Sequence, residues 1–295
     1  MVNTLELEQE GAIATLEEHQ KAMYHLLVAF DKVCQTLNIQ YFLFAGTLLG
    51  AVRHQGFIPW DDDLDVLMLR SDYERLMSEA PDLFEKENLY LQREYSEHYP
   101  MFFSKLRING TTCLEPYYPK DDKVHQGVYM DIFPCDNAYK SKLGRWLQFA
   151  ASKVVIAKGL DLEGYVTDSK LKKFVMFLSR CFPLAPFHRI VKGPQKQNEF
   201  VHTFLGASSK IENSVYPSYI FSDTIKLPFA GGEFCSPQRY DMLLKILYGD
   251  YMEIPIPEER KCKKHAVLVD LKNSYEKYAG YRENIRIGHS TRSIR

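Results

Sequence analysis

Several features that would place the chain in a common class are absent from its sequence. The six cysteines form no Cys-x-x-Cys pair, which argues against a disulfide framework and fits reduced, structural thiols in the cytoplasm. They are Cys34, Cys113, Cys135, Cys181, Cys235 and Cys262. No uncharged apolar run reaches the roughly 18 residues of a transmembrane helix, and the acidic residues 1–6 do not resemble a signal peptide. We therefore expect a cytoplasmic protein.

An excess of charge of one sign is also absent. The 37 Lys and Arg residues nearly balance the 38 Asp and Glu residues, so the formal net charge is −1. A balanced charge disfavours nonspecific nucleic-acid binding as the main activity. With 295 residues, 45% of them hydrophobic, the chain can bury a full core as one elaborated domain or as one domain with an appendage.

What the chain does contain is a dense acidic cluster, residues 61–65, between two apolar stretches. Like charges this close repel each other unless they are well solvated or a cation lies among them. If residues 63–69 form a strand, Asp63 and Asp65 point the same way, about 7 Å apart at roughly 3.3 Å per residue. Two carboxylates so placed can hold Mg²⁺ or Mn²⁺. Asp61 and Asp62 would then support the turn, and the alternative is an acidic turn that only caps another element.

A glycine turn precedes the acids. The apolar run 41–45 predicts a buried strand, and Gly46-Thr47 opens a short helix that Arg53-His54 closes. The N–H groups at a helix start and a threonine hydroxyl suit a phosphate oxygen, and arginine suits bidentate phosphate contact. A Gly-Thr pair alone is usually a plain turn. Together with the acidic strand it predicts an anion site and a metal site on adjacent strands.

Two later segments carry further charged residues among apolar ones. Asp131 lies within the apolar stretch 127–134, where an unpaired carboxylate costs several kcal/mol. It must therefore be paired or metal-bound, the alternative being a buried aspartate that caps a turn. Alternation over 102–108 places Lys105 and Arg107 on one strand face, with Asn109-Gly110 as a hairpin turn. That face can hold phosphates or simply be solvated, and the pattern alone does not distinguish the two.

Elsewhere the pattern predicts scaffold elements. These are an amphipathic helix over 16–37, a helix from a capping Ser71 to about residue 78, strands over 90–95 and 225–229, a turn at 230–233, and a helix over 237–247 with Pro237 in its first turn and Gly249 as C-cap. His265 is interpreted as a satisfied surface histidine. Residues 140–196 contain twelve Lys or Arg against three acids, interleaved with apolar runs. Helices of this kind either lie on anionic membrane surfaces or pack on a sheet with a solvated basic face.

The motif 45–50, with Arg53-His54, 56–63 and Asp65, closely resembles the signature of LicD family phosphotransferases, relatives of the fukutin-related proteins in the nucleotidyltransferase superfamily. The resemblance covers roughly residues 20–135 strongly and 215–265 weakly, and leaves 140–200 unaccounted for. It implies an α+β fold, a nucleotidyltransferase-like mixed sheet flanked by helices, here with a mainly helical basic insertion. The expected division is a catalytic core over 1–139, the insertion over 140–200, and a part over 201–295 that completes the catalytic domain.

The resemblance also implies a reaction. Family members transfer a phospho-alcohol, typically phosphocholine from CDP-choline, to a sugar hydroxyl and release CMP. The expected acceptor is a precursor of a cell-surface glycan or teichoic acid that is linked to a lipid. A third acid on a later strand joins the Asp-x-Asp pair, so Asp63, Asp65 and Asp131 are expected to be catalytic and to bind Mg²⁺ or Mn²⁺. The expected donor-binding residues are Gly46, Thr47, Arg53, His54, Lys105 and Arg107. No zinc site is expected.

Choline and a lipid-linked acceptor would each need further contacts. A quaternary ammonium calls for aromatic faces, and the candidates near the motifs are Trp60, Tyr117, Tyr118 and Tyr129. A lipid-linked acceptor would make membrane contact through residues 140–196 useful, with the protein peripheral on the inner face of the membrane.

Three other functions stay open. The chain could be a nucleotidyltransferase that releases pyrophosphate, or a non-catalytic assembly partner with the same fold. The intact Gly-Thr turn and the three acids disfavour the assembly partner, because a protein without activity is free to lose them. An RNA-directed transferase would need a basic, aromatic-rich surface, and only residues 140–196 approach one.

Overall fold

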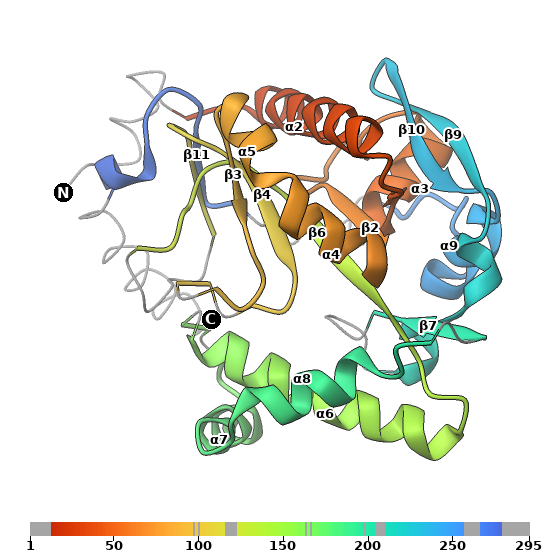
Figure 1. The fold of residues 1–295 in the computed structure, drawn as a ribbon. Coiled ribbons are helices and arrows are strands. Elements are labelled where there is room, and N and C mark those ends of the chain that lie inside the picture. Colours follow the sequence, from red (N-terminus) through yellow and green to blue (C-terminus); the bar gives the residue numbers. More distant parts are fainter. Residues whose placement is uncertain are drawn as a thin grey trace.

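A mixed β-sheet of order β1-β2-β6-β4-β3 runs through the centre of the protein (Figure 1). The computed structural model describes residues 13–96, 98–99, 101–115, 123–162, 164–165, 167–196, 199–203, 210–256 and 266–278. Its strands are β1 Phe42–Leu43, β2 Asp65–Leu69, β3 Leu89–Gln92, β4 Ser104–Ile108, β5 Thr112–Leu114, β6 Tyr129–Asn137, β7 Phe200–His202, β8 Val215–Pro217, β9 Thr224–Phe229, β10 Gly232–Pro237 and β11 Leu268–Asp270. Its α-helices are α2 Leu16–Leu37, α3 Ala45–His54, α4 Arg70–Glu79, α5 Pro81–Lys86, α6 Lys142–Leu162, α7 Lys170–Ser179, α8 Leu184–Lys192 and α9 Tyr240–Tyr248.

The direction of the strands alternates except at one pair. β2 and β6 are parallel, whereas β1 with β2, β6 with β4, and β4 with β3 are antiparallel. The far end of β6 also pairs with β7, which pairs with β8. The expected mixed sheet flanked by helices is therefore confirmed.

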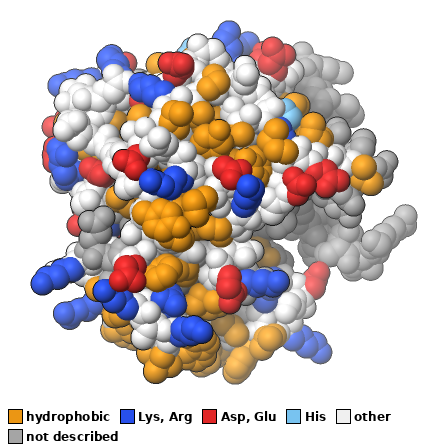
Figure 2. All heavy atoms as spheres, turned by 90° about the vertical axis from the view of Figure 1, so that its right-hand side faces the viewer, with side chains coloured by type: hydrophobic (Ala, Val, Ile, Leu, Met, Phe, Trp, Pro, Cys, Tyr) orange, Lys and Arg blue, Asp and Glu red, His pale blue; other side chains and the backbone are white. Residues whose placement is uncertain are grey.

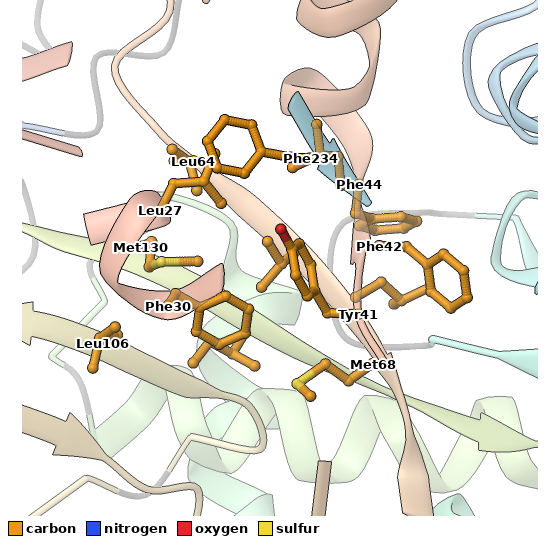
Figure 3. Packing of buried hydrophobic residues seen from close by; sticks show 14 of the residues in the cluster. Leu27, Phe30, Tyr41, Phe42, Phe44, Leu64, Met68, Leu106, Met130 and Phe234 are labelled. Carbon is orange, nitrogen blue, oxygen red and sulfur yellow. The ribbon is translucent and has the colours of Figure 1, made fainter. Parts of the chain in front are cut away.

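Helix α2 covers one face of the sheet, over the predicted range 16–37. Thr15 and Glu18 form a reciprocal capping box at its start, and Asn38 ends it in the left-handed conformation, with φ of 49°. Its buried apolar stripe packs on Leu106 and Met130 of the sheet (Figure 3). Each large apolar side chain buried in this way contributes about 1.5–3 kcal/mol, so α2 and the sheet form the main core.

The predicted hairpin at Asn109-Gly110 is wrong, although a turn forms there, with Gly110 at φ +74°. Both edges of β4 already pair, one with β3 and the other with β6, so the next strand has no free edge beside it. β5 instead pairs antiparallel with β11, where Thr112 is the partner of Asp270, more than 150 residues later in the chain. Local turn chemistry was visible in the sequence, but the strand partner depended on the whole sheet.

Two predicted helix starts are also corrected. Helix α4 begins at Arg70, directly after β2, and its N-cap Leu69 makes no side-chain cap, so Ser71 is not the capping residue. Pro237 ends strand β10, where it pairs with Thr224, and the following helix begins only at Tyr240. The predicted glycine C-cap is confirmed, because the Gly249 N–H bonds to the Lys245 carbonyl.

The insertion is helical, as predicted. Helices α6, α7 and α8 lie below the sheet in Figure 1, and a small core, centred on Phe102, Val155 and Val191, joins them to it. Within the described residues, no single helix combines the length and the hydrophobicity needed to cross a membrane. Helices α7 and α8 together reach that length and hydrophobicity, but they are bent by 103° relative to each other.

A buried ion network connects the end of β2 to β6. The Arg70 guanidinium donates from Nε and Nη2 to the two carboxylate oxygens of Asp136, at 2.7 and 2.8 Å, and from Nη1 to Glu94 at 2.8 Å. The Asp136 side chain is only 3% exposed. Removing one member of such a network leaves a buried charge without its partner.

We expect Arg70→Ala to lower the free energy of unfolding by about 3–5 kcal/mol, because Asp136 would stay buried and unpaired. Urea unfolding followed by circular dichroism measures this change. The control is Lys32→Ala, which removes the exposed ion pair with Glu87 and should change stability by less than ~1 kcal/mol. Equal effects of the two substitutions would show that the buried network contributes no more than a surface pair.

Candidate active site

Three charged side chains lie in a row across neighbouring strands. Asp65 on β2 is the register partner of Asp131 on β6, and Asp131 is the register partner of Lys105 on β4. Paired residues point to the same face of a sheet, with about 4.8 Å between neighbouring strands. Met130 and Ile132, which alternate with Asp131, belong to the core under α2. The row therefore lies on the face opposite α2, and the sheet brings together acids separated by 66 positions.

The glycine turn holds Asp65 in place through its backbone. The Asp65 N–H donates to the Thr47 hydroxyl at 2.8 Å, and its carbonyl accepts from the Phe44 N–H at 3.1 Å. Thr47 is buried, with 4% of its surface exposed. Its hydroxyl thus positions the first residue of β2, a role that the sequence did not predict. The expected phosphate contact of Thr47 stays a prediction.

The acidic turn folds back against the start of α3. A Cβ atom on Gly46 would lie 2.8 Å from Oδ2 of Asp61 and 3.8 Å from Oδ1 of Asp63, so a side chain at this position would displace the Asp61 carboxylate. The preceding Ala45 has a φ of +45°, an uncommon conformation for a residue with a side chain. Asp62 is buried and accepts a hydrogen bond from the Ala266 N–H at 3.1 Å. Asp62 therefore supports the turn, as expected.

The electrostatics of the row favour an added positive charge. Burial raises the pKa of Asp65 well above its usual range, and the charges of Asp63, Asp131 and Asp61 raise it further. Burial likewise raises the pKa of Asp131, although the Lys105 ammonium acts in the opposite direction. Neutral protonated acids or a bound cation would each relieve this repulsion.

Lys105 is the cation of the row, and it has two further contacts. Its Nζ lies 3.1 Å from Oδ1 of Asp131 and 3.6 Å from Oε1 of Glu115, and 3.4 Å from the ring centroid of Tyr129. The Tyr129 hydroxyl donates to Glu115 at 2.9 Å. Glu115 was missed in the sequence, where it is one polar residue after a short strand and carries no local signal.

Arg107 shares the strand face of Lys105, as predicted, but the structure gives it a different setting. It is 1% exposed, and its guanidinium donates to the Gln92 side chain and, at 2.8 Å, to the Gly127 carbonyl. It also lies over the Tyr129 ring, 4.8 Å from the centroid. This position supports a role in holding the sheet together, and the expected phosphate contact of Arg107 stays a prediction.

Arg53 and His54 close α3, and Arg53 contacts the segment after α9. Nη1 of Arg53 donates to the carbonyls of Tyr251 and Glu253, at 2.8 and 3.1 Å, and its Nε donates to Nε2 of His54 at 3.0 Å. The His54 ring packs edge-on against Trp60, with 6.2 Å between centroids. Both residues thus anchor a neighbouring segment here, and their predicted donor contacts stay predictions.

A tyrosine that the sequence did not single out lies near the acids. Tyr248 is 45% exposed overall, but loss of water around its hydroxyl raises its pKa, and so do the charges of Asp65, Asp63 and Asp61, whereas Arg53 lowers it. The sequence showed Tyr248 only as the end of a helix. Among the proposed choline contacts, Tyr129 is 5% exposed and faces two protein cations, which does not support that role. Tyr117, Tyr118 and His265 lie outside the described residues.

The donor set fits Mg²⁺ or Mn²⁺ in kind, because these ions prefer carboxylate oxygens. Oδ1 of Asp131 is buried and makes no hydrogen bond of good geometry, although Lys105 lies beside it. The positions of the side chains support a metal site less well than the kind of donor atoms does. Within the described residues, no group of three or more His, Cys, Asp or Glu side chains is arranged to hold a metal ion. Asp65 and Asp131 lie beside each other and Asp63 lies just before β2, so binding of a metal ion by these three acids stays a prediction.

A cavity of about 1030 Å³ lies elsewhere, at the opposite ends of the parallel strands, next to Leu69 and Cys135. It is lined also by Arg70, Tyr95 and His188 and contains none of the predicted site residues. The candidate active site is therefore identified by its charges and its backbone geometry rather than by the volume of a cavity.

Comparison with known proteins gives matches to this part of the chain. Residues 38–149 match the model of the family described as LicD/FKTN/FKRP, nucleotidyltransferase domain. The chain is similar to the lipopolysaccharide cholinephosphotransferase LicD of Haemophilus influenzae, with 29% identity over 268 residues, 84% of this chain and 95% of the relative. It is also similar to uncharacterized proteins of Rickettsia typhi, 32% identical over 43% of this chain and 38% of the relative, and Rickettsia prowazekii, 34% identical over 38% of each.

The raised pKa of Asp65 gives a stability test. Between its unfolded and folded pKa values the native state binds more protons, so this carboxylate makes the protein less stable as pH rises through that window. In a chelating alkaline buffer we therefore expect Asp65→Asn to raise the free energy of unfolding by at least ~1 kcal/mol, the value of one pKa unit. The gain should shrink as pH falls toward the ordinary carboxyl pKa of about 3.9. Urea titrations over this pH range measure it.

Asp223→Asn serves as the matched control. The Asp223 carboxylate is exposed and paired with Arg239 at 2.8 Å, and the hydrogen bond from Arg239 lowers its pKa. Its neutralisation should therefore give no gain in alkaline buffer. If Asp65→Asn were less stable than the wild type throughout the pH range, the inferred repulsion among the acids would be absent.

Proposed function

Residues 38–149 of this chain match the model of the LicD/FKTN/FKRP nucleotidyltransferase domain, and from that match we propose that the protein transfers phosphocholine from CDP-choline to a sugar hydroxyl. The choice of phosphocholine is supported by the similarity to the Haemophilus influenzae cholinephosphotransferase, which covers 84% of this chain. The proposed acceptor is a glycan precursor. CMP would be the second product.

One observation carries the proposal, namely the row of Asp65, Asp131 and Lys105 across three neighbouring strands. Transfer of a phospho-alcohol forms one phosphorus–oxygen bond, from the sugar hydroxyl, and breaks another, to the oxygen that leaves with CMP. The protein must hold the charged phosphates and remove one proton from the hydroxyl. A row with an ammonium at one end and carboxylates at the other supplies both kinds of group.

Each member of the row would then have a role. Asp131 would accept the proton from the attacking hydroxyl, since a raised pKa makes a carboxylate a better base near neutral pH. Lys105 would neutralise charge on the diphosphate, in keeping with its position 3.1 Å from Asp131. Glu115 and Tyr129 would hold Lys105 in place through the contacts described above. The N–H groups at the start of α3 would contact the phosphates.

A divalent ion would complete the charge balance. Asp63, Asp65 and Asp131 are the residues that would hold Mg²⁺ or Mn²⁺, and a bound ion would stabilise negative charge on the diphosphate. The fit rests on the oxygen donors and on the raised pKa of Asp65, which reflects its burial first and then the negative charges of Asp63, Asp131 and Asp61.

We expect purified protein to release CMP from CDP-choline when Mg²⁺ and a sugar acceptor are present, and to stop when the ion is chelated. Asp65→Asn and Asp131→Asn should each lower the rate at least ~100-fold, equivalent to about 2.7 kcal/mol in the activation barrier. Chromatographic measurement of CMP, with a panel of CDP-alcohols as donors, tests both the chemistry and the choice of alcohol.

Asp223→Asn, on an exposed ion pair far along the chain, should keep the wild-type rate. Release of pyrophosphate from a nucleoside triphosphate, without release of CMP from any CDP-alcohol, would favour a nucleotidyltransferase. That alternative is kept because the matching family model describes a nucleotidyltransferase domain. Turnover by Asp65→Asn at more than about a tenth of the wild-type rate would overturn the assignment of Asp65.

A further inference from the structure

Helices α6 and α7 expose large apolar side chains to an unusual degree. The five most exposed large apolar side chains of the described residues all lie on these two helices: Leu171 at 72%, Leu143 at 69%, Phe174 and Phe177 at 61% each, and Trp146 at 59%. Both helices lie at the lower edge of the protein in Figure 1, and hydrophobic side chains gather at the lower end of the space-filling view in Figure 2. We call these exposed side chains the α6–α7 face; Leu143 and Trp146 lie in the first turns of α6, and the other three lie on α7.

The orientation of α7 is the reverse of that expected for an amphipathic helix on a protein surface. Its apolar stripe, Leu171, Phe174, Val175 and Leu178, follows the i, i+3, i+4, i+7 spacing that normally faces a core. All four side chains are at least 41% exposed, whereas the buried positions of the helix are Met176 and Ser179. The apolar stripe of α7 therefore faces away from the protein.

The charge around the α6–α7 face is positive. Lys170, Lys172 and Lys173 lie on α7 itself, and none forms an ion pair with any residue that the structure describes. Asp161, the nearby acid at the end of α6, is already paired with Arg180 at 2.7 Å. Over residues 140–196 the twelve Lys and Arg residues outnumber the three acids. The complementary surface must therefore be apolar beneath and negatively charged at its boundary.

We propose that the α6–α7 face binds the surface of an anionic lipid bilayer, with its aromatic and aliphatic side chains among the acyl chains and its lysines at the headgroups. A helix of ten residues is about 15 Å long, half of the roughly 30 Å hydrocarbon core, so α7 lies along the interface. A second copy of this chain is a poorer occupant, because it would bring two lysine-rich surfaces together. This inference does not depend on the transfer reaction.

Vesicle flotation tests the proposal directly. The full-length protein should float with vesicles that contain phosphatidylcholine and phosphatidylglycerol, and at least ~tenfold less should float with phosphatidylcholine alone. The double variant Phe174→Ser, Phe177→Ser should lose at least ~tenfold of the bound fraction, because it removes two exposed aromatic anchors. Lys170→Gln, Lys172→Gln, Lys173→Gln should weaken binding only to the anionic vesicles and reduce its sensitivity to salt.

The matched control is Val28→Ser, Ile225→Ser, which removes two exposed apolar side chains on α2 and β9. It should float like the wild type, and circular dichroism melts of all variants should coincide, since every substituted side chain is exposed. Failure of the wild type to float with anionic vesicles would overturn the proposal. So would sedimentation of the wild type as a dimer that the Phe variant dissociates, because the α6–α7 face would then bind a second copy. Neither readout uses turnover, so the result is separate from that of the CMP assay.

Discussion

The parallel pairing of β2 with β6 is the interaction on which the rest of the site depends. It sets Asp65 beside Asp131, and the antiparallel neighbour β4 then adds Lys105 to the same row. A shift of one residue in either register would turn one of these side chains to the opposite face, among the apolar residues under α2. The core on that face, with Leu106 and Met130 against α2, therefore also specifies the position of the charges.

The same pairing explains why the site is electrostatically unfavourable by itself. Buried acids close together are costly, and the structure retains them where a hydrophobic sheet would be more stable. Lys105 offsets part of this repulsion and is in turn held by Glu115 and the Tyr129 ring. Strain at Ala45 and the close approach of Gly46 to Asp61 fit the same account, because the turn brings the acids against the start of α3.

Much of this could be predicted from the sequence where the signal was local. Alternation placed Lys105 and Arg107 on one face, as observed, and the apolar setting of Asp131 marked it as a carboxylate that must be paired or metal-bound; the structure shows the pair with Lys105. Contacts between residues far apart in the sequence could not be predicted in this way. Arg107 is buried because of Gln92 and Gly127, which no local pattern connects with it. Glu115 and Tyr248 reach the site only through tertiary structure, and the partner of β5 depended on which strand edges were already paired.

The central claim is that the acids on β2 and β6 together form one cation-binding site for the transfer reaction. Titration of the protein with Mn²⁺, with the free ion followed by electron paramagnetic resonance, measures that site without requiring turnover. The account predicts that the wild type binds Mn²⁺, that Asp65→Asn and Asp131→Asn each weaken this binding at least ~tenfold, and that Asp223→Asn does not. Equal Mn²⁺ binding by all four proteins would contradict it.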